Sequence, residues 1–201
     1  MDLIVDTAKY KKIAKLIAII LFIIGITIAI VEFVGGCVNN EFTWFSLGSF
    51  IFHVIFFIFL LTGLLSKKDK ISELALTILK VFDGVFYPLL ALRRFDSTNW
   101  SDLYSRWESI TFAIAALFVF LVLLFFVFEK ATHKRIYWNL ILLFLALSSL
   151  AILSNFIVMV VNQKVLQKSW NYALESLYLS FLFAGMYLVC ASINYQNEIG
   201  K

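Results

Sequence analysis

Long apolar runs alternate with short polar segments along the chain. The five clearest runs are 13–34, 43–66, 109–128, 136–161 and 172–193. A helix needs about 20 apolar residues to cross the roughly 30 Å of hydrocarbon in a bilayer, and each run is near that length. The pattern therefore predicts an all-α, polytopic transmembrane helical bundle. No soluble domain fits between the runs, so we expect a single integral membrane domain over 1–201.

The segment 71–95 is apolar on one helical face and polar on the other when residues are placed at about 100° intervals. The polar face carries Ser72, Glu73, Thr77, Lys80, Asp83, Gly84, Tyr87, Ala91 and Arg94. The apolar face carries Ile71, Leu74, Ile78, Val81, Phe82, Val85, Leu89 and Leu92. Two arrangements follow. Either 71–93 is a sixth span with its charged face turned into the bundle, or the segment is an interfacial amphipathic helix beside five spans.

Insertion energies leave both arrangements open. Each Leu, Ile, Val or Phe contributes about −0.3 to −0.6 kcal/mol, while Lys80 and Asp83 near the centre cost about +2.5 to +3.5 kcal/mol each, so the sum is close to zero. In the spanning arrangement we expect Lys80 and Asp83, three residues apart, to form an ion pair inside the bundle. Pro88 removes one backbone hydrogen bond and predicts a kink or a break.

Charge counts do not separate the two arrangements. Six spans with both termini inside place eleven Lys and Arg residues on the cytoplasmic side and five outside, whereas five spans give thirteen and four. Six spans also gather aromatic residues into two interfacial belts. These are Trp44, Trp100, Trp107 and Trp170 outside, and Tyr10, Trp138 and Tyr195 inside. On this ground we favour six spans in the cell membrane, with a cytoplasmic N-terminus.

Polar groups in hydrocarbon are costly, so those inside the runs are candidate functional residues. The interior candidates are Lys80, Asp83, His53, Glu73 and Asn155. His53 shares a helical face with Ser46 and Ser49, an arrangement that suits either a proton relay or a hydrogen bond between helices. Asn155 commonly holds neighbouring helices together in this setting.

Two further groups of residues depend on how the helices pack. Six spans bring Glu32, Glu108 and Glu175 near one leaflet, where three carboxylates would attract cations, while five spans scatter them over both sides. Stripes of small residues let helices approach closely and predict packing seams. The seam residues are Ala18, Gly25 and Ala29 in the first run, and Ser176, Ser180 and Ala184 in the last.

Composition narrows the class of function. The chain is 62% hydrophobic and only 15% charged, and its basic residues cluster beside apolar runs, which fits cytoplasmic loops rather than a nucleic-acid surface. Cys37 and Cys190 lack metal-ligand spacing, and no nucleotide-binding, zinc-protease or hydrolase motif is present. We therefore expect no enzyme, no cofactor, no metal and no nucleic-acid partner.

Two functions remain open. The first is a transport or channel-type bundle with a polar interior. The second is a non-transporting accessory, regulatory, immunity or defence-type subunit that acts through helix–helix contacts. In either case the partners are the lipid bilayer and a second copy of the chain (a homo-oligomer) or another membrane protein.

Overall fold

The computed structural model describes residues 7–38, 44–65, 69–161 and 163–199, and these residues form six helices without a strand. The helices are α1 (Thr7–Val38), α2 (Trp44–Leu65), α3 (Asp69–Ser97), α4 (Leu103–Thr132), α5 (Arg135–Val161) and α6 (Gln163–Ile199). The predicted all-α bundle is confirmed. The outer limits of the second run, residues 43 and 66, lie outside the described residues.

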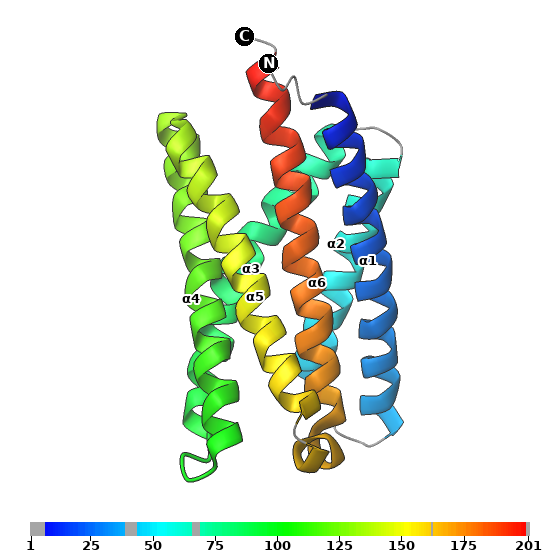
Figure 1. The fold of residues 1–201 in the computed structure, drawn as a ribbon, viewed down its shortest axis with the longest axis vertical. Helices are drawn as coiled ribbons and strands as arrows, with labels where there is room; N and C mark the ends of the chain where they lie inside the picture. The colour runs from blue at the N-terminus through cyan, green and yellow to red at the C-terminus, as the bar shows by residue number, and fades with distance from the viewer. Residues whose placement is uncertain (1–6, 39–43, 66–68, 162, 200–201) are drawn as a thin grey trace, which may run out of the picture.

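The helices run alternately up and down, so that α1 begins and α6 ends at the same end of the bundle (Figure 1). This end, called the N/C end, also holds the end of α2, the start of α3 and the α4–α5 turn; the opposite end is called the far end. Each helix packs beside its neighbour in the chain, and α1 packs along α6, which closes the ring. Short connections between long helices favour this antiparallel order.

Local signals fix two of the turns. Asp102 precedes α4, and its carboxylate accepts a hydrogen bond from the Ser105 backbone N–H at 2.8 Å, which satisfies a donor at the helix start. His133 ends α4 in the left-handed region with φ 51°, and its N–H donates to the Glu129 carbonyl. The chain therefore reverses at both ends of α4 within a few residues.

Five of the six helices are long and apolar enough to cross a membrane. The candidate spans are Lys9–Val38, Lys70–Ser97, Leu103–Thr132, Arg135–Val161 and Ala173–Ser192. The described apolar part of α2, Phe50–Leu65, is shorter, but α2 packs beside α3 in the same bundle. The chain thus has the architecture of a multi-pass membrane bundle with five to six spans.

The ambiguous segment 71–95 belongs to α3, which carries its polar face inward. Lys80 and Asp83 are only 3% and 0% exposed. The apolar face is turned outward, with exposures of 45–69% for Leu74, Val81, Val85, Leu89 and Leu92. A helix resting on the membrane surface would instead hold its charges in water. The burial pattern is that of a helix crossing the bundle, and α3 continues unbroken past Pro88 to Ser97.

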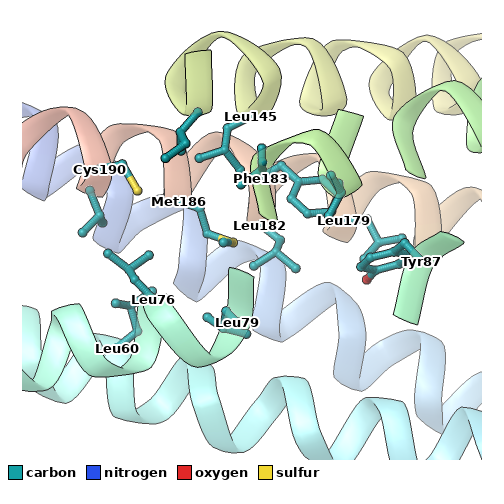
Figure 2. Packing of buried hydrophobic residues seen from close by; sticks show 14 of the residues in the cluster. Leu60, Leu76, Leu79, Tyr87, Leu145, Leu179, Leu182, Phe183, Met186 and Cys190 are labelled. Carbon is teal, nitrogen blue, oxygen red and sulfur yellow. The ribbon is translucent and has the colours of Figure 1, made fainter. Parts of the chain in front are cut away.

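A continuous apolar core fills the space between the helices (Figure 2). Its fully buried members include Leu60 of α2, Leu79 of α3, Leu145 of α5 and Phe183 of α6. Cys190 is buried in the same core, while Cys37 is exposed near the end of α1. The core therefore draws on helices that are far apart in the sequence.

The predicted seam in α1 lies against α6. Ala18, Gly25 and Ala29 are buried, and a Cβ added at Gly25 would lie 3.7 Å from the Phe181 Cβ. A closer approach in the same interface occurs at Gly185, where an added Cβ would lie 2.5 Å from the Phe22 ring. Small residues on both helices thus bring α1 and α6 together.

The predicted seam in α6 lies against α5. Ser176 and Ser180 are buried and Ala184 is half-buried. The Ser149 hydroxyl donates to the Ser180 carbonyl at 2.9 Å, and the Ser180 hydroxyl donates to the Ser149 carbonyl at 3.1 Å. These reciprocal hydrogen bonds satisfy both hydroxyls within the bundle.

The aromatic belts expected from the sequence are only partly visible. Trp100 and Trp107 are exposed beside the α3–α4 turn at the far end, with 48% and 44% of their surface accessible, and Tyr10 is exposed near the start of α1. Trp138 instead turns inward, and its indole nitrogen is buried. The side chains of Trp44, Trp170 and Tyr195 lie outside the described part of the structure.

Candidate functional site

Three polar side chains from α2 and α3 meet in the interior. His53 Nε2 lies 3.1 Å from Asp83 Oδ1 and 3.3 Å from the Tyr87 hydroxyl oxygen. All three residues are at most 3% exposed. Because Asp83 and Tyr87 are four residues apart on α3, both reach the same imidazole on α2. We call these three residues the buried triad.

Aromatic rings surround the buried triad. The Phe82 and His53 rings meet edge to face, with their centres 5.7 Å apart. The centre of the Tyr87 ring lies 6.0 Å from that of Phe112 on α4 and 5.7 Å from that of Phe183 on α6. Asp83 Oδ2 is buried without a hydrogen-bond partner among the described residues. A carboxylate in such apolar surroundings is stabilised mainly by the one imidazole that it contacts. The Ser46 and Ser49 side chains, expected on the same face as His53, lie outside the described part.

The expected ion pair between Lys80 and Asp83 is not formed. The Lys80 ammonium instead lies 4.2 Å from the centre of the Phe126 ring on α4 and 5.4 Å from that of Trp138 on α5. The described residues include no carboxylate within ion-pair distance of Lys80. Although both side chains lie on the inward face, each turns to a different neighbour, since α2 offers Asp83 an imidazole and α4 and α5 offer Lys80 aromatic rings.

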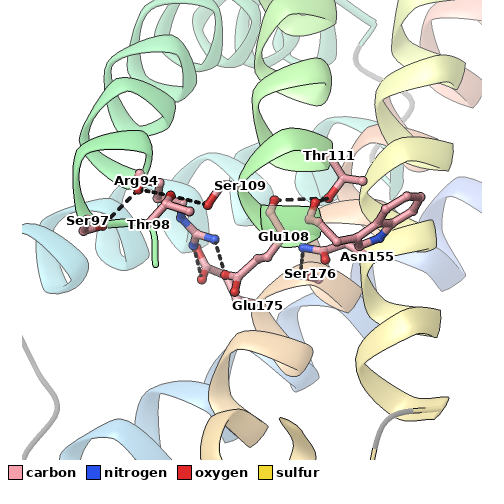
Figure 3. A network of polar contacts seen from close by, with 10 residues as sticks. Arg94, Ser97, Thr98, Glu108, Ser109, Thr111, Asn155, Glu175 and Ser176 are labelled. Atoms are coloured by element: carbon pink, nitrogen blue, oxygen red, sulfur yellow. Dashed lines mark hydrogen bonds and ion pairs between the residues drawn. The ribbon is translucent and has the colours of Figure 1, made fainter. Parts of the chain in front are cut away.

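A second polar cluster lies toward the far end, where Arg94 joins three helices (Figure 3). Arg94 Nη1 donates to Glu108 of α4 at 2.9 Å, and Nη2 donates to Glu175 of α6 at 2.7 Å. The guanidinium also lies 4.2 Å from the Phe112 ring centre. These side chains are 17–25% exposed, so the charges are partly shielded from solvent. We call Arg94, Glu108 and Glu175 the arginine clamp.

Glu32 of α1 completes the acidic group that six spans predict. It is half-buried and lies within electrostatic reach of Glu175 and Arg94. The three acidic candidates are therefore gathered toward one end of the bundle, but a guanidinium lies among them. Arg94 neutralises part of their charge, so the expected attraction of cations by three carboxylates is weaker than the sequence suggested. Within the described residues, no group of three or more His, Cys, Asp or Glu side chains is placed to hold a metal ion.

The two remaining interior candidates differ. The Asn155 side-chain amide donates to the Ser176 hydroxyl at 3.4 Å and so links α5 to α6, while its carbonyl oxygen is buried with no partner in the described part. Glu73 is exposed in the first turns of α3, so its assignment to the interior is wrong. The helical wheel placed Glu73 on the polar face, but that part of α3 lies near the N/C end, where carboxylates reach water.

The sequence interpretation missed the roles of Arg94 and Tyr87. Both were on the polar face of 71–95, at spacings of three, four and seven residues along Lys80, Asp83, Tyr87 and Arg94. These spacings place the four side chains on one helical stripe. The signal was thus present, but it could not indicate which helices would supply their partners.

Tyr87 and Tyr178 interact electrostatically with acidic residues of both the buried triad and the arginine clamp. Tyr87 lies within electrostatic reach of Asp83 on one side and of Tyr178 and Glu175 on the other. Tyr178 of α6 in turn lies within reach of Glu175 and Glu32. A series of ionisable groups therefore extends from the centre of α3 toward the far end. We call this series the polar column.

Comparisons with protein-family models, with curated proteins and with solved structures give no match, so the chain's own residues carry the functional argument.

Proposed function

We propose that the protein is a transport-type membrane bundle in which a small cation or a proton moves along the inward face of α3. The observation that carries the proposal is the inward placement of ionisable groups at three successive depths of this helix, namely the buried Lys80 and Asp83 and the half-buried Arg94. Ionisable groups in a membrane interior are costly and typically mark ion or substrate pathways.

The extent of this stripe supports a path rather than an isolated site. Lys80 and Arg94 are fourteen residues apart, which at 1.5 Å per residue corresponds to about 21 Å along the helix axis. This covers much of the roughly 30 Å hydrocarbon thickness. Asp83 and Tyr87 lie between them on the same stripe. Polar groups are thus available at regular depths along α3.

The small-residue seams pack against other helices of the same chain, and this favours transport over the accessory-subunit alternative. That alternative assigns partner recognition to the small-residue stripes. Ala18 and Gly25 are instead buried against α6, and Ser180 is hydrogen-bonded to α5. These stripes are therefore not available to a partner helix unless the bundle opens.

We propose that the N/C end faces the cytoplasm. Basic residues gather there, at the start of α1 and at the α4–α5 turn, as the positive-inside rule requires. They include Lys9, Lys11, Lys12, Lys15, Lys130, Lys134 and Arg135.

The exposed Cys37 tests this orientation, because it lies near the end of α1 at the far end. A membrane-impermeant maleimide added to intact cells should label Cys37, and Cys37→Ser should abolish the signal. Labelling only after the cells are broken would reverse the proposed orientation.

Flux through reconstituted protein tests the function. Proteoliposomes that enclose a pH-sensitive or potassium-sensitive dye are given an ion gradient, and the signal is compared with that of empty liposomes. We expect wild-type protein to dissipate one of the gradients and Asp83→Asn to slow this at least about tenfold, because a positioned side chain that transfers a proton typically contributes about 10²-fold or more. His133→Asn is the matched control, since His133 is exposed in a turn. Wild-type liposomes no leakier than empty ones for either ion would overturn the proposal.

A further inference from the structure

We propose that the buried triad is a binding site for a single exchangeable proton, and that this proton is transferred through His53 Nε2. The assignment of the proton as the transported or coupled ion rests on the proposed function. The existence of the proton site rests on the geometry of the triad alone.

The geometry at Nε2 allows only one of its two contacts to be a full hydrogen bond in each protonation state. When Nε2 carries a proton, it donates to Asp83 Oδ1 at 3.1 Å, and the Tyr87 hydroxyl is free to donate elsewhere. When Nε2 is bare and Asp83 is ionised, Nε2 accepts from the Tyr87 hydroxyl at 3.3 Å, and when the proton lies on Asp83 Oδ1, Nε2 accepts from that acid. The two partners therefore alternate, and each protonation state has its own hydrogen-bond arrangement.

A proton that arrives at the Tyr87 hydroxyl oxygen lets Tyr87 pass its own hydroxyl proton to His53 Nε2, so that Tyr87 stays neutral. The imidazolium that results then gives the Nε2 proton to Asp83 Oδ1, which leaves a neutral imidazole and a neutral carboxylic acid. One proton has entered and no other bond has changed. The reverse sequence releases it.

Charge neutrality explains why the site holds one proton. With one proton shared, the Asp83–His53 pair has no net charge, either as acid and imidazole or as carboxylate and imidazolium. Without it the pair is an anion enclosed by phenyl rings, which is costly in apolar surroundings. Release therefore needs a compensating charge or a change in packing, and this requirement is what couples proton movement to a conformational step in a transporter.

Besides its own members, the described groups that act electrostatically on the triad are Tyr178 and Glu175 of α6 and Arg94 of α3. From α4 the Phe112 ring packs against Tyr87, while Lys80 turns toward α4 and α5. Because Glu175 and Arg94 lie toward the far end, a proton would reach Tyr87 from that end.

The ligand set favours a proton over a metal cation. Hard cations take six or more oxygen ligands, whereas this site offers one carboxylate, one phenol and one imidazole enclosed by aromatic rings. Asp83 Oδ2 has no partner in the described part of the structure, so protonation of the carboxylate lowers the cost of leaving this oxygen unpaired.

Histidine-specific nitrogen NMR on the full-length protein in detergent micelles tests the site directly. The sequence contains only His53 and His133, so the spectrum holds two imidazoles, and the exposed His133 is an internal reference. His133→Asn assigns the two signals. Spectra are recorded between about pH 5 and pH 8, where an ordinary imidazole changes charge.

We expect the His53 signal to report proton exchange with Asp83. Asp83→Asn should shift the pH at which the His53 signal moves and leave the His133 signal unaltered. It should also remove one infrared carbonyl band of a protonated carboxylic acid. Tyr87→Phe should keep the two-state behaviour of His53 but slow its exchange with water. If Asp83→Asn does not fold, the wild-type protein alone tests the proton site, through the pH dependence of the His53 signal and the presence of the protonated carboxyl band.

The outcomes separate this inference from the proposed function. An imidazole at position 53 that keeps one state at every pH, with no protonated carboxyl band, would overturn the proton site even if the protein conducts another ion. A titrating triad in a protein without flux would uphold the proton site and overturn the transport role.

Discussion

Replacement of Arg94 tests the arginine clamp, because this one side chain joins α3 to both α4 and α6. Arg94→Gln keeps most of the side-chain length and removes the charge. Arg106→Gln is the control, since Arg106 is exposed in the first turn of α4, two residues before Glu108. Both variants remove one positive charge from this region, so their difference reports the contacts of the clamp.

The expected loss follows from the contacts of the guanidinium. A hydrogen bond between charged groups contributes about 1.5–3 kcal/mol, and Arg94 makes two of them, at 2.9 and 2.7 Å. Its contact with Phe112 adds about 0.5–2 kcal/mol. Glutamine retains one neutral hydrogen bond, and side-chain exposures of 17–25% screen part of the charge. We therefore expect the free energy of unfolding to fall by about 3 kcal/mol, the lower end for breaking a buried pair.

Equilibrium unfolding in mixed micelles, in which a denaturing detergent is titrated against a mild one, measures this loss. Arg106→Gln should change the free energy of unfolding by less than about 0.5 kcal/mol, as exposed substitutions usually do. Glu175→Gln combined with Arg94→Gln should cost less than the sum of the single changes, since the two side chains share a contact. Equal losses for the two arginine variants, or strict additivity with Glu175, would refute the clamp as a stabilising contact.

Two further substitutions test packing and charge on α3. Gly84→Ala would place a methyl group 2.5 Å from the Leu123 Cβ and should lower the free energy of unfolding by about 1–3 kcal/mol. The control is Gly25→Ala on α1, which should be tolerated because the added methyl group would lie 3.7 Å from its nearest neighbours. Similar unfolding curves for the two variants would contradict the close contact of α3 with α4. Lys80→Met removes a buried charge at similar volume and should change stability by less than about 1.5 kcal/mol. A loss above about 3 kcal/mol in the same assay would show that the ammonium has an ionic partner.

The bundle could be predicted from the sequence because the apolar runs are long and clearly separated. The five apolar runs each correspond to a helix. The direction of the polar face of α3 could not be settled in the same way, because its insertion energy is close to zero when the helix is considered alone. Partners on other helices decide it, such as His53 for Asp83 and Glu108 for Arg94, and a single helical wheel does not contain them.

The candidate site was predictable as a set of residues but not as a set of contacts. Lys80 and Asp83 are both buried, yet the ion pair expected from their spacing is replaced by contacts to different helices. Glu108 and Glu175 lie together as six spans require, but their bridging by Arg94 was not foreseen. Spacing along one helix fixes which side chains share a face. It does not fix which neighbour each one meets, because that depends on how the helices rotate and pack.

The near-zero insertion energy of α3 also links stability to the proposed activity. A helix that gains little from lipid alone is held in the bundle by the partners of its polar groups, here the imidazole of α2 and the carboxylates of α4 and α6. Adding or removing a proton at Asp83 alters one of these partnerships without touching the arginine clamp. If the proposed proton site operates, the clamp would hold one end of α3 in place while the packing around the triad changes, so that α3 could shift relative to α2 without unfolding of the bundle.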